Sequence, residues 1–314
     1  MDATSLLARA LIAGLGAAVL LGAPIAASAQ PATAAAEAAY PDSWTHFQAL
    51  KARAKGGLKH THATMPDWTG IWIRQAPRGQ GGSFDLGGGP IPGLVGYGVS
   101  GAVLTPKYKE AYEAKLAKLR AGHEWDRLSW CLPAGFPRWL TEPLLREFIV
   151  TPDQVWLTHE QINETRRIYT DGREHIPDDQ ATPLWMGDSI GFWDGDTLVI
   201  HTNHLKAGEY QRGQPDFSFQ ITTVEEMRKV DPDTVEIRVT VYDPPSLLRP
   251  YKAVFTYRKD KTPGLRVHYA ACEENNNVYR TPEGGSAEHL PGEPQYRDAS
   301  TFGIPEVALD TLPE

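Results

Sequence analysis

The chain has 314 residues and a formal net charge of −8, and its lysines and arginines form no basic block. Because nucleic-acid binding depends on concentrated positive charge, this balance argues against nucleic acid as a partner. Beyond the N-terminal region, no apolar segment is long enough to cross a membrane, so we expect no stable membrane span in the mature protein.

Residues 1–29 have the pattern of an export signal. Arg9 precedes an apolar run from Ala10 to Leu21, and Ala27-Ser28-Ala29 supplies the small-x-small pattern that signal peptidase needs. An uncleaved membrane anchor is the less favoured alternative, because the run is short and rich in alanine and glycine. We therefore expect a periplasmic or secreted protein.

The chain contains two cysteines, Cys131 and Cys272. In an oxidising compartment an even pair is typical of one disulfide, and the alternative is two separate buried thiols. Export also favours a reaction that needs no diffusible cofactor. The sequence holds no P-loop, and no glycine motif in the strand–turn–helix setting of a dinucleotide fingerprint, so no cofactor is expected.

The first part of the mature chain has few regular elements. Residues 30–66 are interpreted as a linker with a short helix near Trp44–Ala54, and the alternation in 67–72 predicts a first strand. Residues 79–102 are crowded with glycine and proline, which is typical of a mobile loop or lid.

A second helix is predicted from Pro106 to Arg120. Proline at its start, Gly122 beyond its end and a stripe of apolar and tyrosine side chains at 108, 112, 116 and 119 support it. The aromatic, proline-broken segment 125–143 follows. We treat residues 79–145 as an insertion into a β domain that extends from 67 to 282, with 283–314 as an extended tail.

From Arg146 the chain becomes a series of short β-rich segments separated by turn signals. The predicted strands are 147–150, 155–159, 165–169, 189–193, 197–202, 221–230, 234–242, 252–258 and 265–270. No helical crossover fits between them, so we expect an antiparallel meander, closed or nearly closed into a lipocalin-like barrel with one or two peripheral helices. A β-sandwich is the alternative.

Alternation within the strands indicates what the barrel encloses. In Thr234–Tyr242, one face carries Val235, Ile237, Val239 and Val241, and the other face is polar. The simpler interpretation is an apolar interior beneath a solvated outer face, and the alternative is a polar lumen that holds a ligand.

The densest ionisable segment lies between Arg166 and His204. Asp194-Gly195-Asp196 within it has the composition of a hairpin turn, so the flanking strands would run back along each other. Asp188 then falls nearly opposite His201, within a residue or two of register. A carboxylate beside an imidazole orients the ring and raises its basicity, which suits a general base, although a purely structural hydrogen bond is equally compatible.

We therefore expect His201 to act as the base and Asp188 to orient it. Arg173, Tyr169 and His175 are the expected substrate contacts.

Metal binding is the competing interpretation of the same segment. His201 and His204 are three apart, with His175 and Asp188 as further ligands. Residues three apart in a strand point to opposite faces, so the two histidines converge only if His204 lies beyond the strand end. Without an HExxH or paired CxxC motif, no metal is expected.

Several motifs resemble a widespread family of exported, largely uncharacterised bacterial proteins. They are Cys131–Arg138, Arg167–Arg173, Gly187–Gly191, Trp193–Val199, Asp243-Pro244 and Ala271–Asn276, and together they cover roughly residues 67–280. The resemblance implies a secreted, barrel-like β domain and supplies no reaction. In the family pattern the residues at the positions of Asp188 and His201 are exchanged, which implies that the two side chains belong to one constellation.

Nine tryptophans and twelve tyrosines offer material to line an apolar pocket. We expect a periplasmic, cofactor-independent lyase, dehydratase or isomerase that acts on a small apolar or aromatic molecule, such as a lignin-derived phenol that releases formaldehyde. Two alternatives remain open. One is a lipocalin-like carrier for a hydrophobic ligand, and the other is a metal-dependent hydrolase that uses His175, His201 and His204.

Overall fold

The computed structural model describes residues 40–75, 102–121, 126–142, 144–207, 215–268, 272, 277–282 and 286–296. These residues belong to one compact unit, Tyr40–Glu314. The predicted export signal and nearly all of the glycine-rich segment 79–102 lie outside the described residues. Within the described ranges, no helix is long and apolar enough to cross a membrane.

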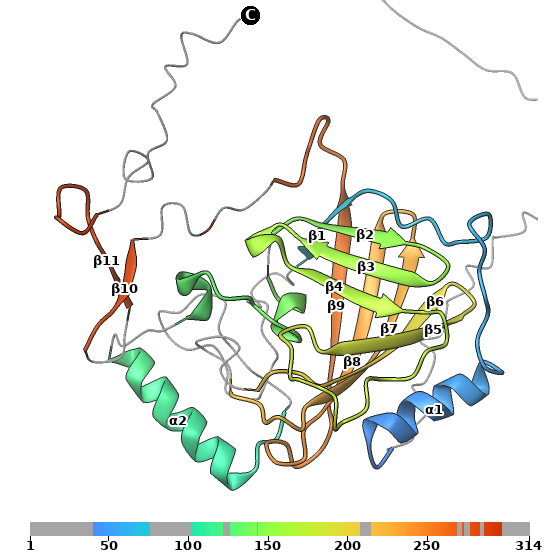
Figure 1. The fold of residues 1–314 in the computed structure, drawn as a ribbon, viewed down its shortest axis with the longest axis horizontal. Helices are drawn as coiled ribbons and strands as arrows, with labels where there is room; N and C mark the ends of the chain where they lie inside the picture. Colours follow the sequence, from blue (N-terminus) through green and yellow to red (C-terminus); the bar gives the residue numbers. More distant parts are fainter. Residues whose placement is uncertain are drawn as a thin grey trace, which may run out of the picture. The chain divides into compact units, whose positions relative to one another are not determined.

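The unit is built around a closed β-barrel, as predicted (Figure 1). Its strands are β1 Ile71–Gln75, β2 Arg146–Val150, β3 Gln154–His159, β4 Thr165–Tyr169, β5 Asp188–Asp194, β6 Thr197–Asn203, β7 Thr222–Asp231, β8 Thr234–Tyr242 and β9 Tyr251–Asp260. They are neighbours in sequence order, and β9 pairs with β1 to close the barrel. Closure gives every strand two neighbours, which removes exposed sheet edges.

Two details of the expected meander are wrong. First, β4 and β5 pair in parallel, at Tyr169 and Ile190, so the sheet is not antiparallel throughout. The irregular segment 170–187 makes the crossover without a helix. Second, residues 265–268 of the expected last strand are not in a strand. Their β propensity finds no partner because β1 already occupies the free edge of β9.

The barrel interior is a packed apolar core. The inward positions of β8 are Val235, Ile237, Val239 and Val241, and each is 0–1% exposed. They join one cluster with Trp72, Phe148 and other large side chains. The simpler interpretation of the β8 alternation, an apolar interior, is therefore correct.

One buried ion pair lies within this core. The guanidinium of Arg166 donates to both carboxylate oxygens of Glu225, at 2.6 and 2.8 Å, and also to Thr202. Ser189 accepts from Nε of Arg166, and the ring of Phe136 lies 3.8 Å beneath the guanidinium. A buried charge needs such complete pairing, because an unpaired one costs several kcal/mol.

Helix α1 (Ser43–Arg53) packs on the outer wall of the barrel, against β6, β7 and β8 (Figure 1). Its buried side chains Phe47 and Leu50 contact a second apolar cluster on the outward positions of the strands, which includes Phe192 and Val199. Part of the stretch 30–66 is thus attached to the barrel. Burial of this apolar stripe is the main force that holds α1 in place.

The remaining elements do not belong to the nine-stranded barrel sheet. Helix α2 has the predicted bounds, Pro106–Arg120, and buries Tyr112, Leu116 and Leu119 of the predicted stripe. Strands β10 (Val278–Arg280) and β11 (Ser286–Glu288) form a separate two-stranded sheet, so the expected tail contains a short strand. Short 3₁₀ turns occur at Arg127–Trp130, Arg138–Leu140 and Gln161–Asn163.

The predicted disulfide is present. Cys131 and Cys272 are bonded across a sequence separation of 141 residues. The bond joins the segment before β2 to the segment after β9, so the loop that it closes contains β2 to β9.

Candidate functional site

The hairpin β5–β6 presents two of the predicted site residues on one face. Its register pairs Asp188 with Asn203 and Ile190 with His201, so Asp188 and His201 lie two positions apart and both point out of the barrel. Gly187 permits the close approach of the strands, since its φ is +66° and a Cβ there would lie 2.5 Å from the carbonyl oxygen of Asn203. The predicted hairpin is confirmed.

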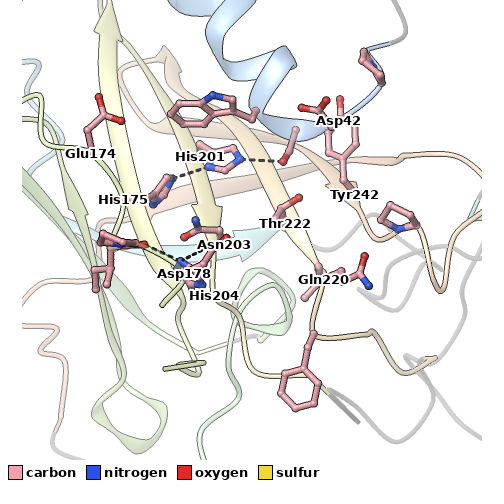
Figure 2. Close-up of a pocket in the computed structure, with 18 residues that line it drawn as sticks. Asp42, Glu174, His175, Asp178, His201, Asn203, His204, Gln220, Thr222 and Tyr242 are labelled. Atoms are coloured by element: carbon pink, nitrogen blue, oxygen red, sulfur yellow. Dashed lines mark hydrogen bonds and ion pairs between the residues drawn. The ribbon is translucent and has the colours of Figure 1, made fainter. Parts of the chain in front are cut away.

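The crossover segment inserts a third residue between them. Nδ1 of His175 is 2.7 Å from Oδ2 of Asp188. Nε2 of the same ring is 2.7 Å from Nδ1 of His201 (Figure 2). The backbone N–H of Ile176 also donates to Oδ2 of Asp188. Asp188 therefore orients His175, and His175 in turn orients His201.

Helix α1 contributes the fourth member of this chain of hydrogen bonds. Oγ of Ser43 is 2.9 Å from Nε2 of His201, across 158 residues of sequence. Sequence reasoning missed Ser43. The only local signal is its place beside Asp42, which caps the helix by accepting from the backbone N–H of Thr45. We call Ser43, His201, His175 and Asp188 the relay.

The carboxylate sets the direction of the hydrogen bonds in the relay, because an ionised carboxylate only accepts. With neutral rings, Nδ1–H of His175 donates to Asp188 and Nδ1–H of His201 donates to Nε2 of His175. Nε2 of His201 is then left as an acceptor, and the hydroxyl of Ser43 donates to it. This is the order in which a serine is prepared to lose its proton.

Burial determines the charge state of His201, whereas hydrogen bonds determine that of Asp188. Desolvation, helped by the nearby ring of His175, lowers the pKa of His201 to about 3, so this imidazole is neutral at physiological pH. Burial by itself would raise the pKa of Asp188. Hydrogen bonds from His175 and from the backbone of Ile176 outweigh it, and the pKa of Asp188 lies below its ordinary value.

The relay borders a cavity of about 720 Å³ on the outside of the barrel wall (Figure 2). The side chains that line it are Pro41, Asp42, Ser43, Trp44, Glu174, His175, Ile176, Pro177, Asp178, His201, Asn203, His204, Phe219, Gln220, Ile221, Thr222, Tyr242 and Pro244. The indole of Trp44 lies 5.3 Å from the His201 ring, between centroids, and is 40% exposed. An aromatic and partly polar wall of this size suits a small organic molecule.

Two of the expected substrate contacts lie elsewhere. Arg173 forms an ion pair with Asp171 and stacks over the ring of Tyr169 at 3.9 Å, and neither Arg173 nor Tyr169 lines the cavity. The exposed Arg–Asp pair satisfies the guanidinium locally. The third expected contact, His175, is a member of the relay.

The proposed metal ligands do not converge. Nε2 of His204 donates to the carbonyl of Ile176 at 3.0 Å, whereas His175 and His201 use their ring nitrogens within the relay. Among the described residues, no group of three or more His, Cys, Asp or Glu side chains is arranged to hold a metal ion.

A second serine deserves comparison with Ser43. Residues Gly187–Gly191 have the spacing G-x-S-x-G, which in some hydrolases presents a nucleophile on a sharp turn. Here the motif lies in β5, and Ser189 is 1% exposed and points into the barrel, where it contacts Arg166 and Thr202. Ser189 therefore belongs to the core, and Ser43 is the serine at the cavity.

Comparison of the chain with protein-family models and with curated protein sequences finds no match.

Proposed function

We propose that the protein is an exported, cofactor-independent enzyme that acts on a small, largely apolar or aromatic molecule by general acid–base chemistry. His201 is the base. The observation that carries the proposal is the hydrogen-bonded relay from Asp188 through His175 to His201 at the wall of the cavity. The disulfide is compatible with export.

His201, His175 and Asp188 have separate roles in the proposed reaction. Burial lowers the pKa of His201, so the ring is neutral at physiological pH and the lone pair of Nε2 is available as an acceptor. Burial also disfavours the protonated ring, and the charge of Asp188 opposes that effect. The positive charge formed there is stabilised through His175 by the ionised Asp188. Because the side chains of His201, His175 and Asp188 are largely buried, this electrostatic stabilisation is stronger than it would be at an exposed surface.

The cavity wall favours an apolar or aromatic substrate. Trp44, Phe219 and Tyr242 line it together with the isoleucines at 176 and 221. The hydroxyl of Tyr242 is 3.0 Å from Nδ1 of His46, which fixes the ring orientation. The more specific expectation of a lyase, dehydratase or isomerase stays a prediction from the sequence.

Ring opening of 5-nitrobenzisoxazole tests the proposal directly, because this reaction of a small aromatic molecule needs only proton abstraction. We expect the protein to accelerate it and His201→Gln to lose about 10²–10⁴-fold in kcat/KM. Asp188→Asn keeps an oxygen that accepts from His175 but removes the charge, so it should lose tenfold or more, about 1.4 kcal/mol. His268→Gln, an exposed histidine outside the cavity, is the matched control.

Equal rates for His201→Gln and the unmodified protein would contradict the proposal. Saturable binding of the probe without any acceleration would instead favour the carrier alternative, with the outer cavity as its binding site. Thermal unfolding of each variant checks that a loss of rate is not a loss of fold.

A further inference from the structure

The hydroxyl of Ser43 is hydrogen-bonded to Nε2 of His201, the nitrogen that acts as the base in the proposed function. The Oγ–Nε2 distance is 2.9 Å, and both side chains border the cavity although Ser43 is only 4% exposed and His201 only 3%. A substrate that gives its proton directly to His201 must first displace the hydroxyl. A substrate that reacts with Ser43 uses the hydrogen bond as it stands.

The position of Ser43 in α1 shows that its hydroxyl is not needed by the helix. Serine near a helix start commonly caps the free backbone N–H groups. Here Asp42 performs that task, accepting from both the backbone N–H and the hydroxyl of Thr45. The Ser43 hydroxyl is directed instead to an imidazole on the barrel wall.

The electrostatic surroundings support ionisation of this hydroxyl during a reaction. His201 is a neutral acceptor, and the carboxylate that balances its later positive charge is two hydrogen bonds away. Ser43 is also the first residue of α1, where the positive end of the helix dipole favours negative charge that develops nearby.

We propose that Ser43 is a nucleophile and that the site transfers acyl groups from small apolar or aromatic esters to water. This proposal rests on the role of His201 as base and names the reaction that it serves. Oγ of Ser43 bonds to the ester carbonyl carbon while its proton passes to Nε2 of His201. The carbon–oxygen bond to the leaving alcohol then breaks, and that alcohol takes the proton from His201.

The second half returns the enzyme to its starting state. A water molecule gives a proton to His201 and attacks the acyl carbon, the bond to Oγ breaks, and Ser43 recovers its proton from the imidazolium. The net reaction consumes one ester and one water and releases an acid and an alcohol. No oxidant, reductant or metal enters the balance.

Two probes test Ser43, and both use the full protein. With p-nitrophenyl benzoate we expect a burst of p-nitrophenolate equal to the enzyme concentration, and with an alkyl fluorophosphonate a covalent adduct on the peptide that contains Ser43. Ser43→Ala should abolish the burst and the adduct, and Ser286→Ala, at a serine that does not line the cavity, should change neither. His201→Gln should slow the burst by about 10²–10⁴-fold.

The benzisoxazole reaction separates this proposal from the proposed function. Because Ser43→Ala uncovers Nε2 of His201, that variant should increase the rate of proton abstraction while it loses the ester burst. Absence of both burst and adduct in the unmodified protein, or an adduct on Ser189 that Ser43→Ala leaves intact, would overturn the role of Ser43. If His201→Gln still lost the benzisoxazole activity in that case, the role of His201 as base would remain supported and only the role of Ser43 as nucleophile would be rejected.

Discussion

At the scale of single residues, Glu164 shows how burial alters a titratable group outside the relay. Glu164 is only 7% exposed, and its Oε1 accepts from the backbone N–H of Gly135 at 3.0 Å. Desolvation, reinforced by the nearby carboxylate of Glu142, raises the pKa of Glu164 to about 7 despite that hydrogen bond. The folded state thus holds a proton that the unfolded chain loses near pH 4.5.

This difference predicts a pH-dependent stability. Since the native state binds more protons than the unfolded state between about pH 4.5 and 7, the contribution of Glu164 to stability falls as pH rises through that window. Glu164→Gln keeps an acceptor for Gly135 and removes the charge, so it should stabilise the protein by roughly 3 kcal/mol at pH 8 and hardly at all at pH 4. Urea denaturation at both pH values measures this difference, and a gain of equal size at both would contradict it.

The positions of the relay side chains could be predicted only in part. The sequence pattern correctly placed Asp188 and His201 on one hairpin face, because a two-residue turn fixes the register of its strands. The pattern did not show that His175 stands between them, since an irregular crossover has no periodicity from which its side-chain directions can be predicted.

At the scale of elements, α1 determines whether the relay is complete. Its hold on the barrel comes largely from Phe47, which is 1% exposed and lies 5.3 Å from the ring of Phe192 and 5.6 Å from that of His201, between centroids. The helix has few residues and no strong propensity of its own, so packing must stabilise it.

We therefore expect Phe47→Ala to cost about 3–5 kcal/mol of unfolding free energy and to weaken the ester burst as Ser43 leaves His201. Gln48→Ala, a partly exposed neighbour in the same helix, is the control and should change stability by less than about 0.5 kcal/mol. Urea denaturation and burst amplitude measure the two effects. Similar stability for the two variants would show that α1 does not depend on this contact.

At the scale of the whole molecule, the disulfide between Cys131 and Cys272 closes a loop that contains most of the barrel. A cross-link over so long a loop limits the unfolded chain more than the folded one, which in the chain-entropy model is worth roughly 5 kcal/mol. We expect dithiothreitol to lower the Tm of the protein. The double variant with Cys131→Ser and Cys272→Ser should show the lower Tm without reductant and no response to it. A reductant effect of equal size in that variant would contradict this explanation.

Features that depend on local chemistry could be predicted from the amino-acid sequence. Period-two alternation and turn residues predicted most of the barrel strands, the apolar stripe and its flanking residues predicted α2, and the two cysteines predicted the disulfide. These signals act within a few residues of one another, or require only one partner of the same kind.

Contacts between residues that are far apart in the sequence could be identified only in the three-dimensional structure. Residues 265–270 have the composition of a strand. Because β1 pairs with β9 and closes the barrel, residues 265–268 have no described neighbouring strand with which to pair. The parallel pairing of β4 with β5 brings the crossover over the outer wall, and packing of α1 places Ser43 against His201. Neither contact has a local sequence signal, because each results from how the whole chain buries its apolar faces.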